Sequence, residues 1–116
     1  MNSNVIFFGW NRAIPGRERL SAGHFQEFVK YLGGLQGNGT IQSFDVVLLN
    51  AHGGDMNGFF LIRGESGKLG KLVASQDWVT HMARATLHLE GSGAVLGVTG
   101  EALTERMQLW TSLLPA

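Results

Sequence analysis

A polar, glycine-containing stretch at residues 52–57 separates two runs of apolar and β-branched side chains, residues 40–50 and 58–64. A short connection of this composition between two such runs is typical of a β-hairpin. The two runs are therefore predicted to be neighbouring antiparallel strands. This hairpin restricts the possible folds more than any other segment, because it requires an antiparallel sheet at the centre of the chain.

The remainder of the chain alternates between strand and helix patterns. The apolar run at residues 5–10 suits a strand that is buried on both faces, and residues 94–98 predict a fourth strand. Apolar side chains at steps of three and four positions predict helices. These helices are expected at residues 17–35, at residues 67–74, from the predicted N-cap Ser75 to residue 89, and at residues 101–114.

The order of these elements predicts a single α+β domain over residues 1–116. Two split β-α-β units give the ferredoxin-like β-α-β-β-α-β arrangement, here with an extra C-terminal helix, in which helices cover one face of a four-stranded antiparallel sheet. The other face of such a sheet is normally polar. Here residues 7–8, 46–49 and 59–62 are apolar on both faces. We therefore expect a homodimer in which a second copy covers the free sheet face.

Composition excludes several classes of function. The nine basic and nine acidic residues give a formal net charge of zero, so no strongly basic surface for nucleic acid is expected. The chain has no cysteine, which excludes disulfides, thiolate catalysis and cysteine-ligated metal sites. The longest apolar run is too short to cross a bilayer, and the N-terminus lacks the basic region of a secretory signal. We therefore expect a soluble cytoplasmic protein with no membrane partner.

This element order, with strands that are apolar on both faces, resembles the dimeric α+β barrel superfamily, which includes antibiotic-biosynthesis monooxygenase-like proteins and haem-degrading monooxygenases. The resemblance covers nearly the whole chain and rests on element order and apolar patterning. It implies a homodimer. Because members include cofactor-independent oxygenases, isomerase-like enzymes and proteins with no known activity, the resemblance leaves the activity of this chain open.

Haem-degrading members carry an Asn on the first strand and a Trp and a His on the second helical segment. Asn11, Trp78 and His88 occur in that order. However, Trp78 and His88 belong to one helix that is predicted to be continuous, which places them roughly 80° apart around its axis. A Trp in an apolar stripe is normally core, and an exposed His is normally surface. We therefore predict no haem and no other cofactor.

Two histidines are candidate general bases. His24 falls on the apolar stripe of the first helix, where it either points into a cavity between helix and sheet or bonds a backbone carbonyl in the core. His52 and Asp55 in the hairpin form either a base with its orienting carboxylate or two metal ligands. The alternative is ordinary turn chemistry, which explains all of this stretch except His52. Two ligands do not complete a metal site, so no metal is predicted.

Asp45 and Arg63 are charged residues inside apolar strands. If Ala51 pairs with Asn57 across the hairpin, Asp45 lies opposite Arg63. A buried charge is costly unless it is paired. The two residues are therefore either a structural ion pair or an anion clamp, in which Arg63 holds a substrate carboxylate and Asp45 orients it. Asn11, at the end of the first strand, is expected to supply a polar group beside them.

Three functions remain open at this point. The leading hypothesis is a homodimer that binds a small organic molecule in an apolar pocket between sheet and helices. The second is a cofactor-independent monooxygenase or isomerase that acts on an aromatic or polyketide-like substrate, with His24 or His52 as the base. The third is a structural or regulatory dimer without a ligand site. For the leading hypothesis, the residues expected to bind the ligand are Asn11, His24, Asp45, Arg63 and Trp78.

Overall fold

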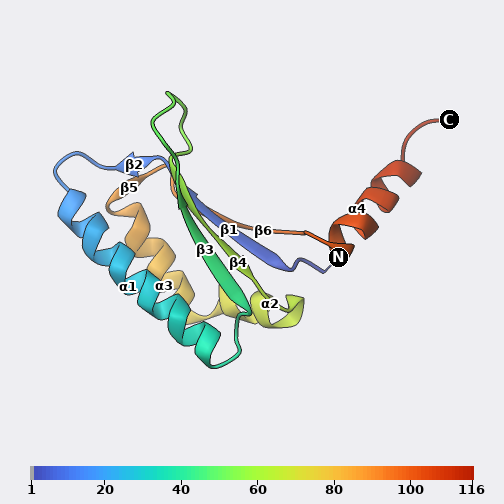
Figure 1. Ribbon diagram of the computed structural model, residues 1–116, viewed down its shortest axis with the longest axis horizontal. Coiled ribbons are helices and arrows are strands. Elements are labelled where there is room, and N and C mark those ends of the chain that lie inside the picture. Colours follow the sequence, from blue (N-terminus) through green and yellow to red (C-terminus); the bar gives the residue numbers. More distant parts are fainter. Residues whose placement is uncertain (1) are drawn as a thin grey trace.

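The computed structural model describes residues 2–116. Four strands form one antiparallel sheet in the order β3-β4-β1-β6, and the helices α1, α2 and α3 lie along one face of it (Figure 1). A further helix, α4, follows β6. The bounds are β1 Val5–Trp10, α1 Glu18–Gly37, β3 Ser43–Leu48, β4 Gly58–Arg63, α2 Ser66–Ala74, α3 Gln76–Thr86, β6 Gly93–Gly97 and α4 Glu101–Ser112.

This architecture confirms the α+β class and the ferredoxin-like order with an extra C-terminal helix. Ser75 is the predicted N-cap of α3, and its Oγ accepts a hydrogen bond from the Trp78 N–H at 3.3 Å. Two details differ. The helix ends at Thr86 and not at residue 89. A short ribbon also pairs β2 (Arg12–Ala13) with β5 (Leu89–Glu90), and two-residue strands are too short to show periodicity in a sequence.

The register of the β3–β4 hairpin differs from the predicted one by two residues. Asp45 lies opposite Leu61, and Arg63 lies opposite Ser43. The reason is a longer connection: the Leu49 N–H donates to the Asn57 carbonyl at 2.9 Å, so pairing stops at Leu49 instead of Ala51. A shift by an even number leaves every side chain on its predicted face. The shift therefore changes which residues are cross-strand partners, and it does not change which side chains lie on each face of the sheet.

The hydrophobic core lies between the sheet and the helices. The sheet contributes Ile6, Phe8, Phe60 and Ile62, none of which is more than 5% exposed. The Phe28 ring of α1 contacts Phe60 edge to face, with ring centroids 5.1 Å apart. Such aromatic pairs add to the free energy gained from burial alone. The other core residues contributed by the helices are Leu32 of α1, Leu69 and Leu72 of α2, and Trp78 and Ala85 of α3.

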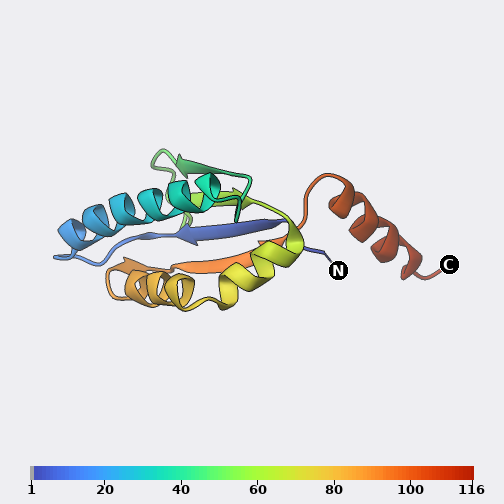
Figure 2. The same ribbon diagram turned by 90° about the horizontal axis from the view of Figure 1, so that it is seen from below.

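Helix α4 stands away from the rest of the molecule (Figure 2). None of its residues is buried. Its predicted apolar stripe is exposed: Leu103, Met107 and Trp110 on the helix, and Leu114 just after its end, are each at least 45% exposed. The stripe is therefore unpartnered within residues 2–116. No helix in this described part of the chain combines the length and the apolar character needed to cross a bilayer.

The sheet face opposite the helices is also apolar. Phe7 and Phe59 stack there with ring centroids 4.9 Å apart. Leu61 and Val95 are the cross-strand partners of Phe7, so their side chains lie on the same face. Val95 is 62% exposed. Within the described residues this free face has no helix over it, as expected from strands that are apolar on both sides.

Candidate functional site

A cavity of about 260 Å³ lies between the sheet and the helices α1 and α3. This volume is near the lower limit for small-molecule sites. Most of the wall is aromatic or aliphatic, and the exceptions are Ser21, His24 and His88. The large apolar side chains of the lining are Phe8, Trp10, Phe25, Phe28, Leu48, Phe60 and Leu89. The cavity is therefore an apolar space with its polar groups on one side.

Three histidines and a serine form a continuous hydrogen-bonded series beside this cavity, which we call the histidine series. Ser21 Oγ lies 2.7 Å from His88 Nδ1. His88 Nε2 lies 2.8 Å from His24 Nδ1, and His24 Nε2 lies 2.9 Å from His81 Nδ1. All three distances are normal hydrogen-bond lengths. His24, a candidate base predicted from the sequence, is thus joined to His81 and His88, which the sequence did not connect with it.

His88 reaches the series because α3 ends before it. The helix stops at Thr86, Leu87 caps it, and the backbone then enters β5. The His88 carbonyl accepts a hydrogen bond from the Ile14 N–H at 2.8 Å and one from Ser21 Oγ at 3.2 Å. His88 is 5% exposed. The prediction of an exposed His88 on a continuous helix is therefore wrong, since this turn directs the ring into the core.

His24 occupies the centre of the series. It is 6% exposed, and the parallel ring of His81 stacks on it at 5.2 Å between centroids. The His88 ring is nearly perpendicular to it at 5.0 Å. Sequence reasoning offered a base at a cavity or a core histidine bonded to a carbonyl. The structure places His24 at the cavity wall and gives it two imidazole partners in place of a carbonyl.

Burial lowers the pKa of all three imidazoles, because the charged form loses its hydration. The pKa of His24 falls from its ordinary 6.5 to about 4, mainly through burial and also through repulsion from Arg84 and the other two rings. Burial, followed by Arg84, also lowers the pKa of His81 and the pKa of His88. Glu27, which pairs with Arg84 at 2.5 Å, opposes this for His24 and His81. At neutral pH the histidine series is therefore uncharged.

Within residues 2–116 no group of three or more His, Cys, Asp or Glu side chains is placed to hold a metal ion. The three imidazoles bond to one another in sequence, so their nitrogens do not converge on a common centre as metal ligands do. A neutral imidazole donates at one nitrogen and accepts at the other. The arrangement is therefore suited to passing protons.

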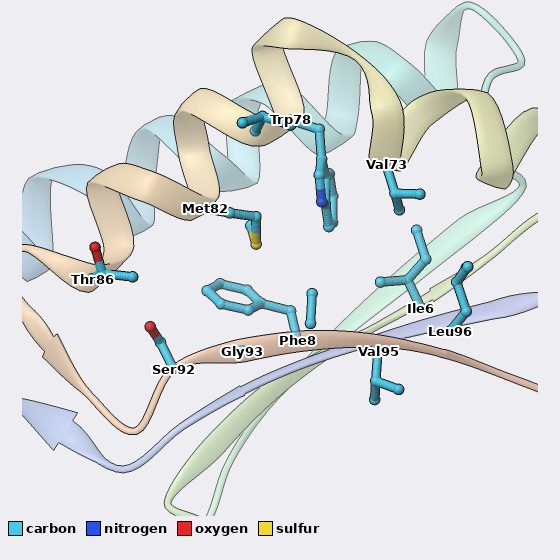
Figure 3. A pocket seen from close by; sticks show the side chains of 12 residues that line it. Ile6, Phe8, Val73, Trp78, Met82, Thr86, Ser92, Gly93, Val95 and Leu96 are labelled. Atoms are coloured by element: carbon cyan, nitrogen blue, oxygen red, sulfur yellow. The ribbon is translucent and has the colours of Figure 1, made fainter.

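A second cavity, of about 540 Å³, lies between α3 and β6 (Figure 3). Trp78 and Met82 extend into it from α3, and Ile6 and Phe8 extend towards it from the sheet. No titratable side chain lines it. Trp78 is 3% exposed and does not line the cavity beside the histidine series. The structure therefore places this predicted ligand-binding residue in the core.

Asp45 and Arg63 contact each other despite the shifted register. Arg63 Nη1 lies 2.7 Å from Asp45 Oδ2, and the two side chains are 40% and 60% exposed. They lie on the free sheet face and not in the helix–sheet cavity. Asn11 is not beside them, because it follows the other end of β1, where its Oδ1 accepts a hydrogen bond from Asn57 Nδ2 at 2.7 Å. In a single chain the pair is thus neither buried nor joined by Asn11.

His52 and Asp55 are exposed in the hairpin connection. His52 Nδ1 bonds the Asn50 carbonyl at 2.9 Å. Gly53 has a φ of 81°, a left-handed conformation that favours glycine. These features are those of a turn. The hairpin residues do not line the helix–sheet cavity.

No protein-family model and no curated protein sequence matches the chain. Among solved structures, the chain is similar to a dimeric protein of unknown function with a ferredoxin-like fold from Bacteroides fragilis. The TM-score is 0.55 at 14% sequence identity, and the match covers 82% of this chain and 95% of that chain. The likeness supports the ferredoxin-like fold described above.

Proposed function

We propose that this chain forms a homodimer that binds a small, mostly apolar organic molecule in the cavity beside the histidine series. The observation that carries the proposal is the composition of the cavity wall, in which Ser21, His24 and His88 are grouped on one side of an otherwise apolar space. Sites for small molecules typically combine apolar walls with a few placed polar groups. They are also enriched in groups with shifted pKa values, which His24 and His88 have.

A second candidate is a cofactor-independent isomerase or monooxygenase, activities implied by the resemblance to the dimeric α+β barrel superfamily. The histidine series favours it, because such reactions begin with removal of a proton from the substrate. A positioned acid or base accelerates this step by about a hundredfold or more. Binding is required in both cases, so it is tested first.

Binding of β-tetralone, a compact aromatic ketone, tests the cavity. Trp10 lines the cavity, so tryptophan fluorescence should change saturably on titration. Ala22 is an exposed residue of the lining, and Ala22→Phe is expected to fill the entrance and abolish binding. The matched control Ala83→Phe adds the same ring at an exposed position of α3 outside the lining. Equal binding by the two variants, or none by the unmodified chain, would contradict the proposal and favour a structural or regulatory dimer.

The homodimer is supported by two unpartnered apolar surfaces. The free sheet face carries Phe7, Phe59, Leu61 and Val95, and α4 carries its exposed stripe. Apolar patches of this kind on a small domain usually mark an interface. A two-fold dimer places the same patch of each copy against the other. The similar Bacteroides fragilis protein is itself described as dimeric.

Sedimentation of the full chain at micromolar concentration tests the assembly, and twice the mass of one chain is expected. Leu61→Lys places a charge on the free sheet face and should produce monomers. Leu20→Lys is the matched control, because Leu20 is 60% exposed on α1 and away from that face. A monomeric unmodified chain, or equal effects of the two substitutions, would refute assembly through the sheet.

A further inference from the structure

The two cavity-lining imidazoles have no free nitrogen to offer a ligand. Both nitrogens of His88 are engaged, by Ser21 and by His24. Both nitrogens of His24 are engaged, by His88 and by His81. A hydroxyl has one proton to donate and two lone pairs to accept with, so Ser21 Oγ keeps spare capacity. It is therefore the member of the series that can accept a proton from a molecule in the cavity.

The other end of the series lies elsewhere. His81 enters the series through Nδ1 and does not line the cavity. It is half-buried, and the Tyr31 ring packs on it at 4.5 Å between centroids. The series thus connects a hydroxyl at the cavity with an imidazole outside it, through two buried rings. Each hydrogen bond is short enough for proton transfer.

We propose that Ser21, His88, His24 and His81 form a proton relay that removes a proton from a molecule in the cavity and then delivers a proton from solvent in its place. The inference rests on the proposed function and narrows the ligand to a small, mostly apolar carbon acid such as an enolisable ketone. A hydroxyl alone is a weak base, so Ser21 has to pass its proton on as it accepts one. The histidine series provides that path.

The proton balance closes without any charged member. The one proton of the Ser21 hydroxyl has two acceptors within reach, His88 Nδ1 at 2.7 Å and the His88 carbonyl at 3.2 Å. Before transfer this proton points to Nδ1, His88 Nε2–H donates to His24 Nδ1, and His24 Nε2–H donates to His81 Nδ1. The ligand C–H bond breaks, its proton binds Ser21 Oγ, and its electron pair becomes the enolate. Each member then hands on one proton, and the partly exposed His81 releases its Nε2 proton to solvent water. Afterwards every hydrogen bond points the opposite way. The Ser21 hydroxyl then exchanges its new proton with solvent, and the reverse transfer delivers this solvent-derived proton to the enolate and restores the starting state.

The charged groups around the series act mainly at its outer end, and Arg84 also acts on His88. Arg84 and Glu27 form an ion pair near His24 and His81, and Asp77 also acts on His81. Glu27 opposes the effect of Arg84 at His24 and His81. At the cavity end the lining is apolar apart from the series itself. The site therefore supplies a proton path in surroundings that disfavour a lasting charge.

Hydrogen–deuterium exchange at the acidic carbon of β-tetralone tests the relay with the full chain in heavy water. The unmodified chain should accelerate exchange about a hundredfold over buffer. His81→Gln keeps a hydrogen-bonding side chain at position 81 and does not touch the ligand. It should reduce the acceleration at least about tenfold while leaving the dissociation constant for β-tetralone unchanged. Ser21→Ala should abolish the acceleration, and the matched control His52→Gln, in the exposed hairpin, should retain it.

Two outcomes would overturn the relay in different ways. If β-tetralone binds and His81→Gln exchanges as fast as the unmodified chain, a single base performs the transfer and the series plays no part. If β-tetralone does not bind, the proposed function fails, and ring-nitrogen NMR tests the series without a ligand. His81→Gln should then change the tautomer equilibrium of His88, two links away, and unchanged His88 nitrogen shifts would refute the coupling.

Discussion

Acidification is expected to destabilise this fold through its buried histidines. The pKa of His24 is about 4 in the folded protein and returns to its ordinary value of 6.5 in the unfolded chain. Between these two values the unfolded chain binds a proton that the folded protein does not. The free energy of unfolding therefore falls as the pH falls through this window. The loss of stability is absent at high pH, begins near the pKa that His24 has in the unfolded chain, and is complete below the pKa that it has in the folded protein.

The size of the effect follows from the pKa shift of His24. Linkage gives a loss of about 2 kcal/mol between about pH 7 and about pH 5 from this residue alone. The lowered pKa values of His81 and His88 act in the same direction. Glu27, whose pKa is lowered mainly by Arg84, loses its contribution only at lower pH, where carboxylates titrate. A loss of this size is a large part of the 5–15 kcal/mol that typically stabilises a domain.

Urea unfolding followed by circular dichroism at several pH values between about 5 and about 7 measures this dependence. The unmodified chain and the control His52→Gln should show the same fall in stability towards acid. His24→Gln removes the central titrating ring and should make the fall shallower, whatever its own stability at neutral pH. A stability that stays level or rises on acidification would show that the histidines are not held neutral by burial. An unaltered fall in His24→Gln would assign it to other groups.

Two further substitutions test local packing. A Cβ on Gly58 would lie 2.5 Å from the Trp10 ring, so Gly58→Ala should lower the free energy of unfolding by about 1–3 kcal/mol. The matched control is Gly34→Ala in α1, where no atom lies near the new Cβ, and it should be neutral or stabilising. Ser75→Ala should lower the free energy of unfolding by about 1 kcal/mol, because it removes the cap oxygen that accepts from the Trp78 N–H, whereas Ser75→Asp should keep most of the stability that the cap provides. Urea unfolding measures both pairs, and equal stabilities within a pair would contradict the prediction for that pair.

Features that depend on near neighbours in the sequence were predictable. The apolar runs identified the four main strands, and Ser75 identified the start of α3. The hairpin register was harder, because the polar stretch between the strands does not show how many residues stay unpaired. Asn57 pairs with Leu49 and not with Ala51, so pairing on the first strand ends two residues earlier than predicted. Asp45 and Arg63 still meet, as diagonal instead of opposite neighbours on one face.

The histidine series could be predicted only in part. His24 stood out because a polar ring on an apolar stripe needs a partner or a cavity. Its partners His81 and His88 are 57 and 64 residues away along the chain, so their meeting depends on how α1 packs against α3. It also depends on α3 ending at Thr86, whereas the apolar periodicity of the sequence predicts a helix that continues to residue 89. A periodic pattern assigns His88 to the helix surface, and tertiary packing places it in the core.

The burial that makes the histidines sensitive to acid also makes the proposed relay possible. A protonated His24 would donate from both nitrogens, so it could no longer accept from either neighbour and the series would be interrupted. The relay therefore depends on the folded pKa of His24, about 4, and not on the ordinary value of 6.5. Because burial lowers the pKa of all three rings, exchange of β-tetralone per folded molecule should fall on acidification with a midpoint below the ordinary value of 6.5. If exchange instead falls with a midpoint near the ordinary histidine pKa, the base is a solvated group and the buried series is not the path of the proton.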